Sequence, residues 1–258
     1  MMKAKNKLFP YLGKIPKGFE SMLFCFHHAG GSASAYYPFI AKEEDVAVIP
    51  VELPGHGARR EEDQMVEWRT LIGPIASQIQ LLVEAYDKPV RLMGCSLGSL
   101  IAFEVAAELE KRGIQVEQLV ICSHCSPDVE SPGYKTSMGK KALKKELETL
   151  SGTDDAIMQD EEMLEFFLPV IYYDYKLHDN YKYDGKVLDN INLKVVAGSE
   201  DPYFNYSNMK NWKYMTTGEY EFQEFEGGHF FPYETGYFDK VISEDEQHEI
   251  KVLQHNRA

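Results

Sequence analysis

Residues 90–101 read VRLMGCSLGSLI, in which the pentapeptide GCSLG occupies positions 94–98 between two apolar stretches. The stretch before it has the length and composition of a buried strand, and the stretch after it, to Leu109, has the periodicity of a helix. The pentapeptide matches the G-x-S-x-G nucleophile elbow, a tight strand-to-helix turn that exposes the serine hydroxyl. Its glycines allow the close backbone approach that such a turn needs. The sequence therefore predicts that Ser96 is a nucleophile.

Strands and helices alternate on both sides of this turn. Strand-like stretches lie at 22–27, 46–53, 116–122, 193–197 and 220–225, and helical patterns lie at 67–86, at 205–215 and from about Tyr237. This alternation is typical of an α/β protein with a mostly parallel central sheet flanked by helices. Together with the elbow at Ser96, it predicts the α/β-hydrolase fold.

The alternation is interrupted between residues 127 and 186. Helical patterns replace strands there, one with leucines three to four residues apart and another that contains Pro169. We expect Pro169 to kink or split its helix. A segment of about sixty residues is too long for a plain connection between strands. The sequence therefore predicts a helical lid insertion at 127–186 and a hydrolase core formed by 1–126 and 187–258.

A serine hydroxyl is a weak nucleophile at neutral pH and needs a base that a carboxylate orients. In the predicted fold these partners follow in the order serine, acid, histidine. Asp201 follows the next-to-last strand-like stretch and is the candidate acid, with Glu200 in the same turn as the alternative. His229 follows the last strand-like stretch in a glycine-rich loop and is the candidate base. We expect Ser96, Asp201 and His229 to form a catalytic triad.

The oxyanion of an acyl-transfer intermediate needs backbone N–H donors. Leu97, directly after the serine, supplies one in this fold, and the other comes from the loop after an early strand. That loop contains the small residues at 29–31, which let the backbone approach an acyl carbon, and Ala29 is the expected donor. His27 and His28 precede it. Adjacent histidines at a strand end point in different directions, so we expect structural roles for them rather than metal binding.

The composition limits the partners. The 258 residues carry a formal net charge of −14, whereas nucleic acid or an anionic membrane would require a basic surface. No apolar run approaches the roughly 20 residues of a membrane-spanning helix, and the apolar stretch near the N-terminus is too short for a signal peptide. The sequence therefore predicts a cytoplasmic protein that binds neither nucleic acid nor a membrane.

Cys122 and Cys125 have the spacing of a metal-binding pair, with His124 between them. A closed zinc site needs about four ligands, and the chain has no second pair at ligand spacing. A free thiol in an apolar context behaves as a small buried hydrophobe. We therefore expect these cysteines to pack at the end of a strand, and we expect no metal.

Several further stretches extend the pattern around Ser96. They are FHHAGGSASAY at 26–36, ELPGHG at 52–57, GSEDP at 198–202 and GGHF at 227–230, with LSGT at 150–153, Leu168-Pro169, Asp174 and Tyr181 in the lid. With these residues the chain resembles the type II thioesterases that accompany nonribosomal peptide and polyketide synthetases. It departs from that family at Cys95, where histidine is usual, and at Leu97, where methionine is common. Neither side chain is required by the chemistry above, because Leu97 acts through its backbone.

The resemblance implies an editing enzyme that removes unwanted acyl groups from the phosphopantetheine thiol of carrier proteins, in pathways such as antibiotic or siderophore biosynthesis. The arm belongs to the substrate, so the enzyme itself would need no cofactor. We expect a monomer whose partners are acyl or peptidyl carrier domains. The lid aromatics Phe166, Phe167, Tyr172 and Tyr173 predict an apolar chamber that binds the acyl chain.

Lys140, Lys141, Lys144 and Lys145 form a basic cluster on one predicted helix of the lid. Such a cluster would suit an acidic carrier domain as a docking patch. A solvated helix face is the simpler interpretation. Charge reversal at these lysines distinguishes the two, because only docking makes the kinetics with carrier-bound substrates depend on them.

Two other functions fit parts of the pattern. A carboxylesterase or lipase uses the same triad on oxygen esters, and a comparison of acyl-carrier thioesters with simple esters separates it from a thioesterase. A noncatalytic binding protein with the hydrolase fold would lack a reactive serine. Reaction of Ser96 with a fluorophosphonate probe therefore separates that protein from an enzyme.

A histidine base predicts the pH dependence of the reaction. His229 accepts the serine proton only as a neutral imidazole, and imidazole ordinarily titrates between about pH 5 and about pH 8. Initial rates of thiol release should therefore fall as the pH is lowered through this range. A flat rate across it would contradict the assignment of His229.

Overall fold

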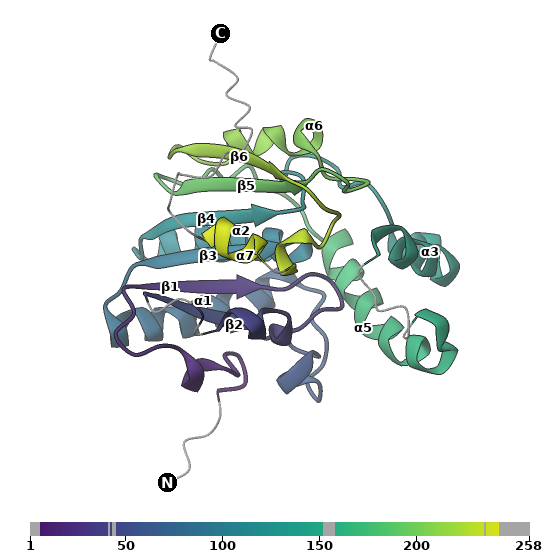
Figure 1. The fold of residues 1–258 in the computed structure, drawn as a ribbon, viewed down its shortest axis with the longest axis horizontal. Coiled ribbons are helices and arrows are strands. Elements are labelled where there is room, and N and C mark those ends of the chain that lie inside the picture. Colours follow the sequence, from purple (N-terminus) through teal and green to yellow (C-terminus); the bar gives the residue numbers. More distant parts are fainter. Residues whose placement is uncertain (1–5, 41, 43–44, 152–157, 235, 243–258) are drawn as a thin grey trace.

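The computed structural model describes residues 6–40, 42, 45–151, 158–234 and 236–242. Six parallel strands form one central sheet in the order β2-β1-β3-β4-β5-β6 (Figure 1). The strands are β1 (Ser21–Phe26), β2 (Val46–Val51), β3 (Val90–Cys95), β4 (Val116–Cys122), β5 (Asn192–Gly198) and β6 (Tyr220–Phe225). The predicted α/β fold is therefore confirmed, and each predicted strand is present.

Helices cover both faces of this sheet. The α-helices of the described residues are α1 (Trp68–Tyr86), α2 (Leu97–Lys111), α3 (Lys140–Leu150), α5 (Glu161–Asp179), α6 (Tyr206–Met209) and α7 (Tyr237–Ile242). Figure 1 shows α1 and α2 behind the sheet and α7 in front of it. Successive residues of a strand point to opposite faces, so Phe24 of β1 packs in the core beneath α1 and α2, and Leu23 packs in the core beneath α7. In the described part of the chain, no helix combines the length and apolar character needed to span a membrane.

The strand order reverses beside β1. The chain passes from β1 to β2 on one side, crosses to β3 on the other side of β1, and then continues outward to β6. In open parallel sheets, ligands bind at the carboxyl ends of the strands where the order reverses. Here β1 leads into the loop with Ala29, and β3 leads into the turn with Ser96. The topology therefore brings these two sequence motifs together.

The chain between β4 and β5 forms α3 and α5, which lie beyond the carboxyl ends of the strands in Figure 1. These two helices have a small core of their own, which includes Leu143, Leu147, Leu164 and Leu168. The helices agree with the helical content predicted for 127–186. The division of the chain at those boundaries stays a prediction.

Pro169 does not split α5, because the helix runs without a break from Glu161 to Asp179. The kink, which was the other expected effect of this proline, stays a prediction. Proline lacks the N–H that would bond to the carbonyl four residues earlier. Leu168 and Ile171, on either side of it, are buried in the lid core. Most helical stability in proteins comes from such packing, so the buried face outweighs one missing hydrogen bond.

Candidate active site

Ser96 lies at the turn between β3 and α2 with backbone angles φ 54° and ψ −122°. A positive φ is strained for a residue with a side chain, and this strain is typical of a nucleophile elbow. Two glycines make the turn possible. A Cβ atom at Gly94 would lie 2.1 Å from the carbonyl oxygen of Gly98, and one at Gly98 would lie 2.2 Å from that of Phe26. Backbone atoms occupy the space on both sides of the serine, so no side chain fits there.

His229 and Asp201 meet beyond the carboxyl ends of β6 and β5. Nδ1 of His229 lies 2.8 Å from Oδ2 of Asp201, and both side chains are buried. The other carboxylate oxygen accepts hydrogen bonds from the backbone N–H groups of Tyr203 and Phe204, at 2.9 and 3.0 Å. Nε2 of His229 is buried and has no hydrogen-bond partner among the described residues, so it is available to a neighbouring hydroxyl. Glu200, the alternative acid, is exposed.

Ser96 and His229 line the same narrow cavity, together with Ala29 and Leu97. The structure thus brings the predicted nucleophile, base and oxyanion residues to one place, with Asp201 behind the imidazole. This arrangement has the components that acyl transfer through a serine requires: a hydroxyl, an oriented imidazole and backbone N–H groups.

The loop that carries Ala29 is a tight turn held from two sides. The N–H of Gly31 donates to the carbonyl of His28 at 3.0 Å, and Gly30 has the positive φ, 75°, that the third residue of a type II turn requires. The Tyr233 hydroxyl lies 2.9 Å from Nδ1 of His28. On the other side, the N–H of Gly30 donates to a carboxylate oxygen of Asp174 on α5 at 2.6 Å.

The remaining histidines and cysteines near the strand ends have structural contacts. Nδ1 of His27 lies 2.9 Å from the carbonyl oxygen of His28. Burial lowers the pKa of both His27 and His28 to about 3, so both stay neutral. Cys122 and Cys125 are buried free thiols. Within the part of the chain that the structure describes, no three His, Cys, Asp or Glu side chains are grouped so that they could hold a metal ion.

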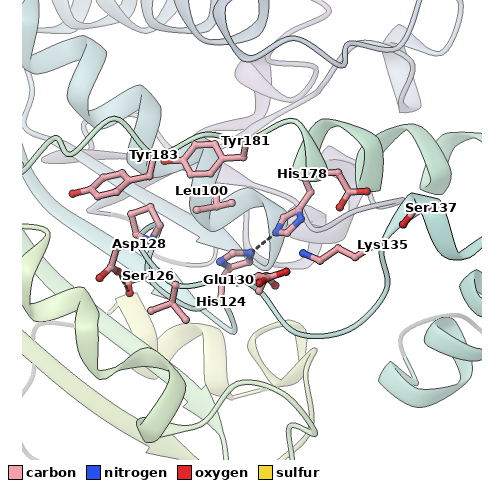
Figure 2. A pocket seen from close by; sticks show the side chains of 14 residues that line it. Leu100, His124, Ser126, Asp128, Glu130, Lys135, Ser137, His178, Tyr181 and Tyr183 are labelled. Carbon is pink, nitrogen blue, oxygen red and sulfur yellow. Dashed lines mark hydrogen bonds between the residues drawn. The ribbon is translucent and has the colours of Figure 1, made fainter.

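A larger cavity of about 460 Å³ adjoins the narrow one and shares His124, Ser131 and His178 with it (Figure 2). The Nε2 atoms of His124 and His178 lie 3.0 Å apart. Burial lowers the pKa of His124 to about 3 and that of His178 to about 4. Both imidazoles are therefore neutral, and the N–H of one donates to the unprotonated ring nitrogen of the other. The lining side chains labelled in Figure 2 are Leu100, His124, Ser126, Asp128, Glu130, Lys135, Ser137, His178, Tyr181 and Tyr183.

This larger cavity is polar. In Figure 2 the Lys135 side chain points toward the two imidazoles, with the Glu130 carboxylate close by. Nδ1 of His178 and Oδ1 of Asp179 are buried and have no hydrogen-bond partner in the described part of the chain. The cavity therefore presents charged and polar side chains, such as those of Lys135 and Glu130, beside the narrow cavity that Ser96 lines.

Comparison with protein families identifies the chain. A model of the thioesterase domain matches residues 21–247. The chain belongs to the thioesterase family. The matched range contains all six strands of the sheet together with Ser96, Asp201 and His229. The family resemblance inferred from the sequence is therefore confirmed.

Individual relatives of this thioesterase come from biosynthetic pathways. The "Probable cadicidin biosynthesis thioesterase" of Streptomyces griseus is 31% identical over 223 residues, which are 86% of this chain and 60% of that protein. RedJ, a thioesterase from the prodiginine pathway of Streptomyces coelicolor, superposes with a TM-score of 0.79 at 26% identity, over 88% of this chain and 84% of RedJ. BorB, a type II thioesterase from the borrelidin cluster, superposes with a TM-score of 0.71 at 30% identity, over 84% of this chain and 89% of BorB.

The four lid aromatics predicted to bind substrate line neither cavity of the thioesterase. Phe166 is 75% exposed and Tyr173 is 40% exposed. Phe167 and Tyr172 pack against the lid core instead. The expected apolar chamber of these aromatics is therefore not found at Ser96, because α5 turns a different face toward the sheet.

That face of α5 consists of Ile171, Asp174, Tyr175 and His178. Their spacing of three and four residues puts them on one side of the helix. Asp174, Tyr175 and His178 line the narrow cavity, and Ile171 lies against Gly30. Tyr175 and His178 are site residues that were not predicted from the sequence. Their spacing is visible in the sequence, but it does not reveal which side of a lid helix faces the core.

Two of the four lysines in the basic cluster form ion pairs within the lid of the thioesterase. Lys140 and Lys144 both approach Glu165 of α5, Lys144 at 3.7 Å. Lys141 and Lys145 are exposed. The charge of this helix is therefore partly neutralised by α5, and a docking role for the cluster stays a hypothesis.

The elbow geometry predicts the effect of Gly98→Ala. The new Cβ would collide with backbone atoms of β1 and push α2 away from it, so we expect a loss of about 1–3 kcal/mol in the free energy of unfolding. We also expect a large loss of thioester hydrolysis, because Ser96 and Leu97 would move. Urea unfolding and initial rates measure the two effects.

Gly73→Ala in α1 is the matched control, because a Cβ there meets nothing within 4 Å. Alanine is the better helix former, so this variant should keep its activity and gain up to about 1 kcal/mol of stability. Wild-type stability and activity in Gly98→Ala would contradict the role of the close approach.

Proposed function

We propose that the chain is an editing thioesterase that hydrolyses acyl thioesters on the phosphopantetheine arm of carrier domains in nonribosomal peptide or polyketide biosynthesis, with Ser96, His229 and Asp201 as its catalytic triad. The chemistry rests on the 2.8 Å contact between His229 Nδ1 and Asp201 Oδ2, with His229 Nε2, which has no hydrogen-bond partner in the described part of the chain, in the cavity that Ser96 lines. The substrate class is supported by family membership and by the pathway names of the relatives.

Acylation begins when Nε2 of His229 accepts the proton of the Ser96 hydroxyl. The serine oxygen then attacks the thioester carbonyl carbon, and the N–H groups of Ala29 and Leu97 donate to the oxyanion of the tetrahedral intermediate. Collapse of the intermediate breaks the carbon–sulfur bond. His229 gives its proton to the departing thiol of the arm, which leaves an acyl ester on Ser96.

Deacylation repeats these steps with water. His229 accepts a proton from a water molecule, the hydroxide oxygen attacks the acyl ester, and the proton returns to the serine oxygen as the carboxylic acid departs. Asp201 orients the imidazole throughout and stabilises its protonated form. The backbone N–H groups of Tyr203 and Phe204 hold this carboxylate in place. No cofactor takes part in these steps, because the arm arrives covalently bound to the acyl group.

The polar cavity beside Ser96 suits a substrate with amide groups. The pantetheine arm carries two amides and a hydroxyl, and aminoacyl groups carry an ammonium group. Lys135 supplies a donor, and the Glu130 carboxylate supplies acceptors. The proposal includes a soluble cytoplasmic monomer that meets carrier domains transiently.

The proposed function predicts the behaviour of active-site variants toward acetyl-, longer acyl- and aminoacyl-carrier proteins, followed by intact mass. Ser96→Ala should lower deacylation by at least about a thousandfold, because the acyl-enzyme cannot form. Asp201→Asn should lower it by on the order of 10³- to 10⁴-fold, because the imidazole loses its oriented tautomer.

Glu200→Gln is the matched control, since Glu200 is the exposed neighbour of Asp201, and its rate should stay within about twofold of wild type. Greater damage from Glu200→Gln than from Asp201→Asn would overturn the choice of acid. Faster hydrolysis of simple oxygen esters than of acyl-carrier thioesters by the wild type would favour a carboxylesterase instead.

A further inference from the structure

Asp174 joins the lid helix α5 to the loop that carries Ala29. Its side chain is buried, and its Oδ2 atom accepts two hydrogen bonds. The first comes from the backbone N–H of Gly30 at 2.6 Å, and the second comes from Nε2 of His56 at 2.9 Å. One carboxylate oxygen thus connects three parts of the chain that are far apart in sequence.

The bond to Gly30 controls the peptide next to the oxyanion donor. In a turn that is closed from Gly31 to His28, the central peptide lies between Ala29 and Gly30, and its N–H points away from the turn. Asp174 holds that N–H, which would otherwise lack a partner beneath α5. The Ala29 N–H belongs to the preceding peptide, between His28 and Ala29, which shares the Ala29 Cα atom with the central peptide. The carboxylate therefore acts on this N–H by holding the whole turn in one position against α5.

Packing at Gly30 makes this contact close. A Cβ atom at Gly30 would lie 2.5 Å from Cγ1 of Ile171, one turn before Asp174 on the same helix. Helix α5 therefore rests directly on the turn, with an apolar contact from Ile171 and a hydrogen bond from Asp174.

His56 fixes the carboxylate from the opposite side. Its Nδ1 lies 2.9 Å from the carbonyl oxygen of Pro54, and its Nε2 lies 2.9 Å from Asp174. Both partners are acceptors, so both ring nitrogens donate and the ring is an imidazolium. The side chains of this ion pair are 2% and 5% exposed. Glu52 holds the same loop by accepting the N–H of Ala58 at 3.0 Å.

We infer that Asp174 is a positioning residue of the reaction: it holds the turn that carries Ala29 through the N–H of Gly30 and so keeps the Ala29 N–H in place for the acyl oxyanion, while His56 holds the Asp174 carboxylate. This inference rests on the proposed function, because it assigns a task to the oxyanion loop. It also implies that the catalytic geometry depends on the position of α5 against this loop.

The ion pair adds a second pH dependence of the rate. The rate should fall as the pH rises, whereas the fall expected from the base His229 occurs at low pH. Burial acts to lower the pKa of His56, but the charge and hydrogen bond of Asp174 and the Pro54 carbonyl outweigh it, so the pKa is raised. The pair is therefore intact at low pH and is lost as the pH rises through this raised pKa. The other titratable groups that face His56 are His27, His28 and Glu52; the two histidines stay neutral, because burial lowers the pKa of each to about 3.

Asp174→Asn tests the inference without a change in size. A neutral His56 whose Nδ1–H donates to the Pro54 carbonyl has a lone pair at Nε2. If the amide nitrogen takes the place of Oδ2, it donates to that lone pair but cannot accept from Gly30. If the amide oxygen takes that place, it accepts from Gly30 but cannot donate to Nε2. The loop should therefore lose its fixed orientation. Loss of an oxyanion donor costs about 10²- to 10³-fold in kcat, so a misdirected donor should lower kcat by about 10- to 100-fold. KM should stay within about twofold, because the interaction strengthens only in the transition state.

Trp68→Phe is the matched control. The Trp68 indole N–H donates to the carbonyl of Leu177 at 2.8 Å, so this variant loosens the same helix from the core without touching the oxyanion loop. Its kcat should stay within about twofold of wild type. Both variants are measured as full chains with an acyl-N-acetylcysteamine thioester, by thiol release, with thermal unfolding as the check on folding.

The pH profile gives a second readout that a purely structural role would not change. Wild-type kcat should fall on the alkaline side as His56 loses its proton. His56→Gln keeps a neutral N–H donor toward Asp174 at every pH, so this alkaline fall should be absent.

The inference is overturned if Asp174→Asn lowers kcat no more than Trp68→Phe does, if it raises KM alone, or if His56→Gln keeps the alkaline fall. A wild type that fails to deacylate acyl-carrier proteins as well would instead overturn the proposed function.

Discussion

The close approach of α2 to β1 is the constraint on which the rest of the site depends. The backbone at Gly98 lies so near the carbonyl groups of Phe26 and His27 that no side chain fits between them. This contact forces the tight turn at Ser96 and brings the N–H of Leu97 beside the loop that follows β1. A nucleophile and two potential oxyanion donors therefore converge because one helix begins directly against a neighbouring strand. The reversal of strand order between β1 and β3 leaves this point open to a ligand.

A second close approach brings the acid and the base together. A Cβ atom at Gly198 would lie 2.4 Å from the carbonyl oxygen of Gly227, so the loops after β5 and β6 touch through their backbones. The N–H of Glu200 also donates to the Gly227 carbonyl at 2.9 Å. These contacts put Asp201 and His229 within hydrogen-bonding distance. The lid completes the arrangement from beyond the carboxyl ends of the strands, through the hydrogen bond between Asp174 and Gly30.

The residues that could be predicted from the sequence are those whose roles follow from local pattern and chain order. The G-x-S-x-G turn located Ser96, and the positions of Asp201 and His229 after successive strands identified them as candidates. The contacts of the lid could not be predicted in this way. Asp174 and Gly30 are 144 residues apart and His124 and His178 are 54 apart, so no local pattern connects them. The acyl chamber predicted from the lid aromatics was misplaced for the same reason, because aromatic composition does not show which side of a helix faces the core.

Reaction with a fluorophosphonate probe shows whether Ser96 is the nucleophile, since only an activated serine hydroxyl reacts readily with it. We expect one adduct per chain, located on Ser96 by peptide mass mapping, with thioester hydrolysis lost in proportion to labelling. Labelling at another residue, or full hydrolysis of acyl-carrier substrate after Ser96 is labelled, would contradict this role of Ser96.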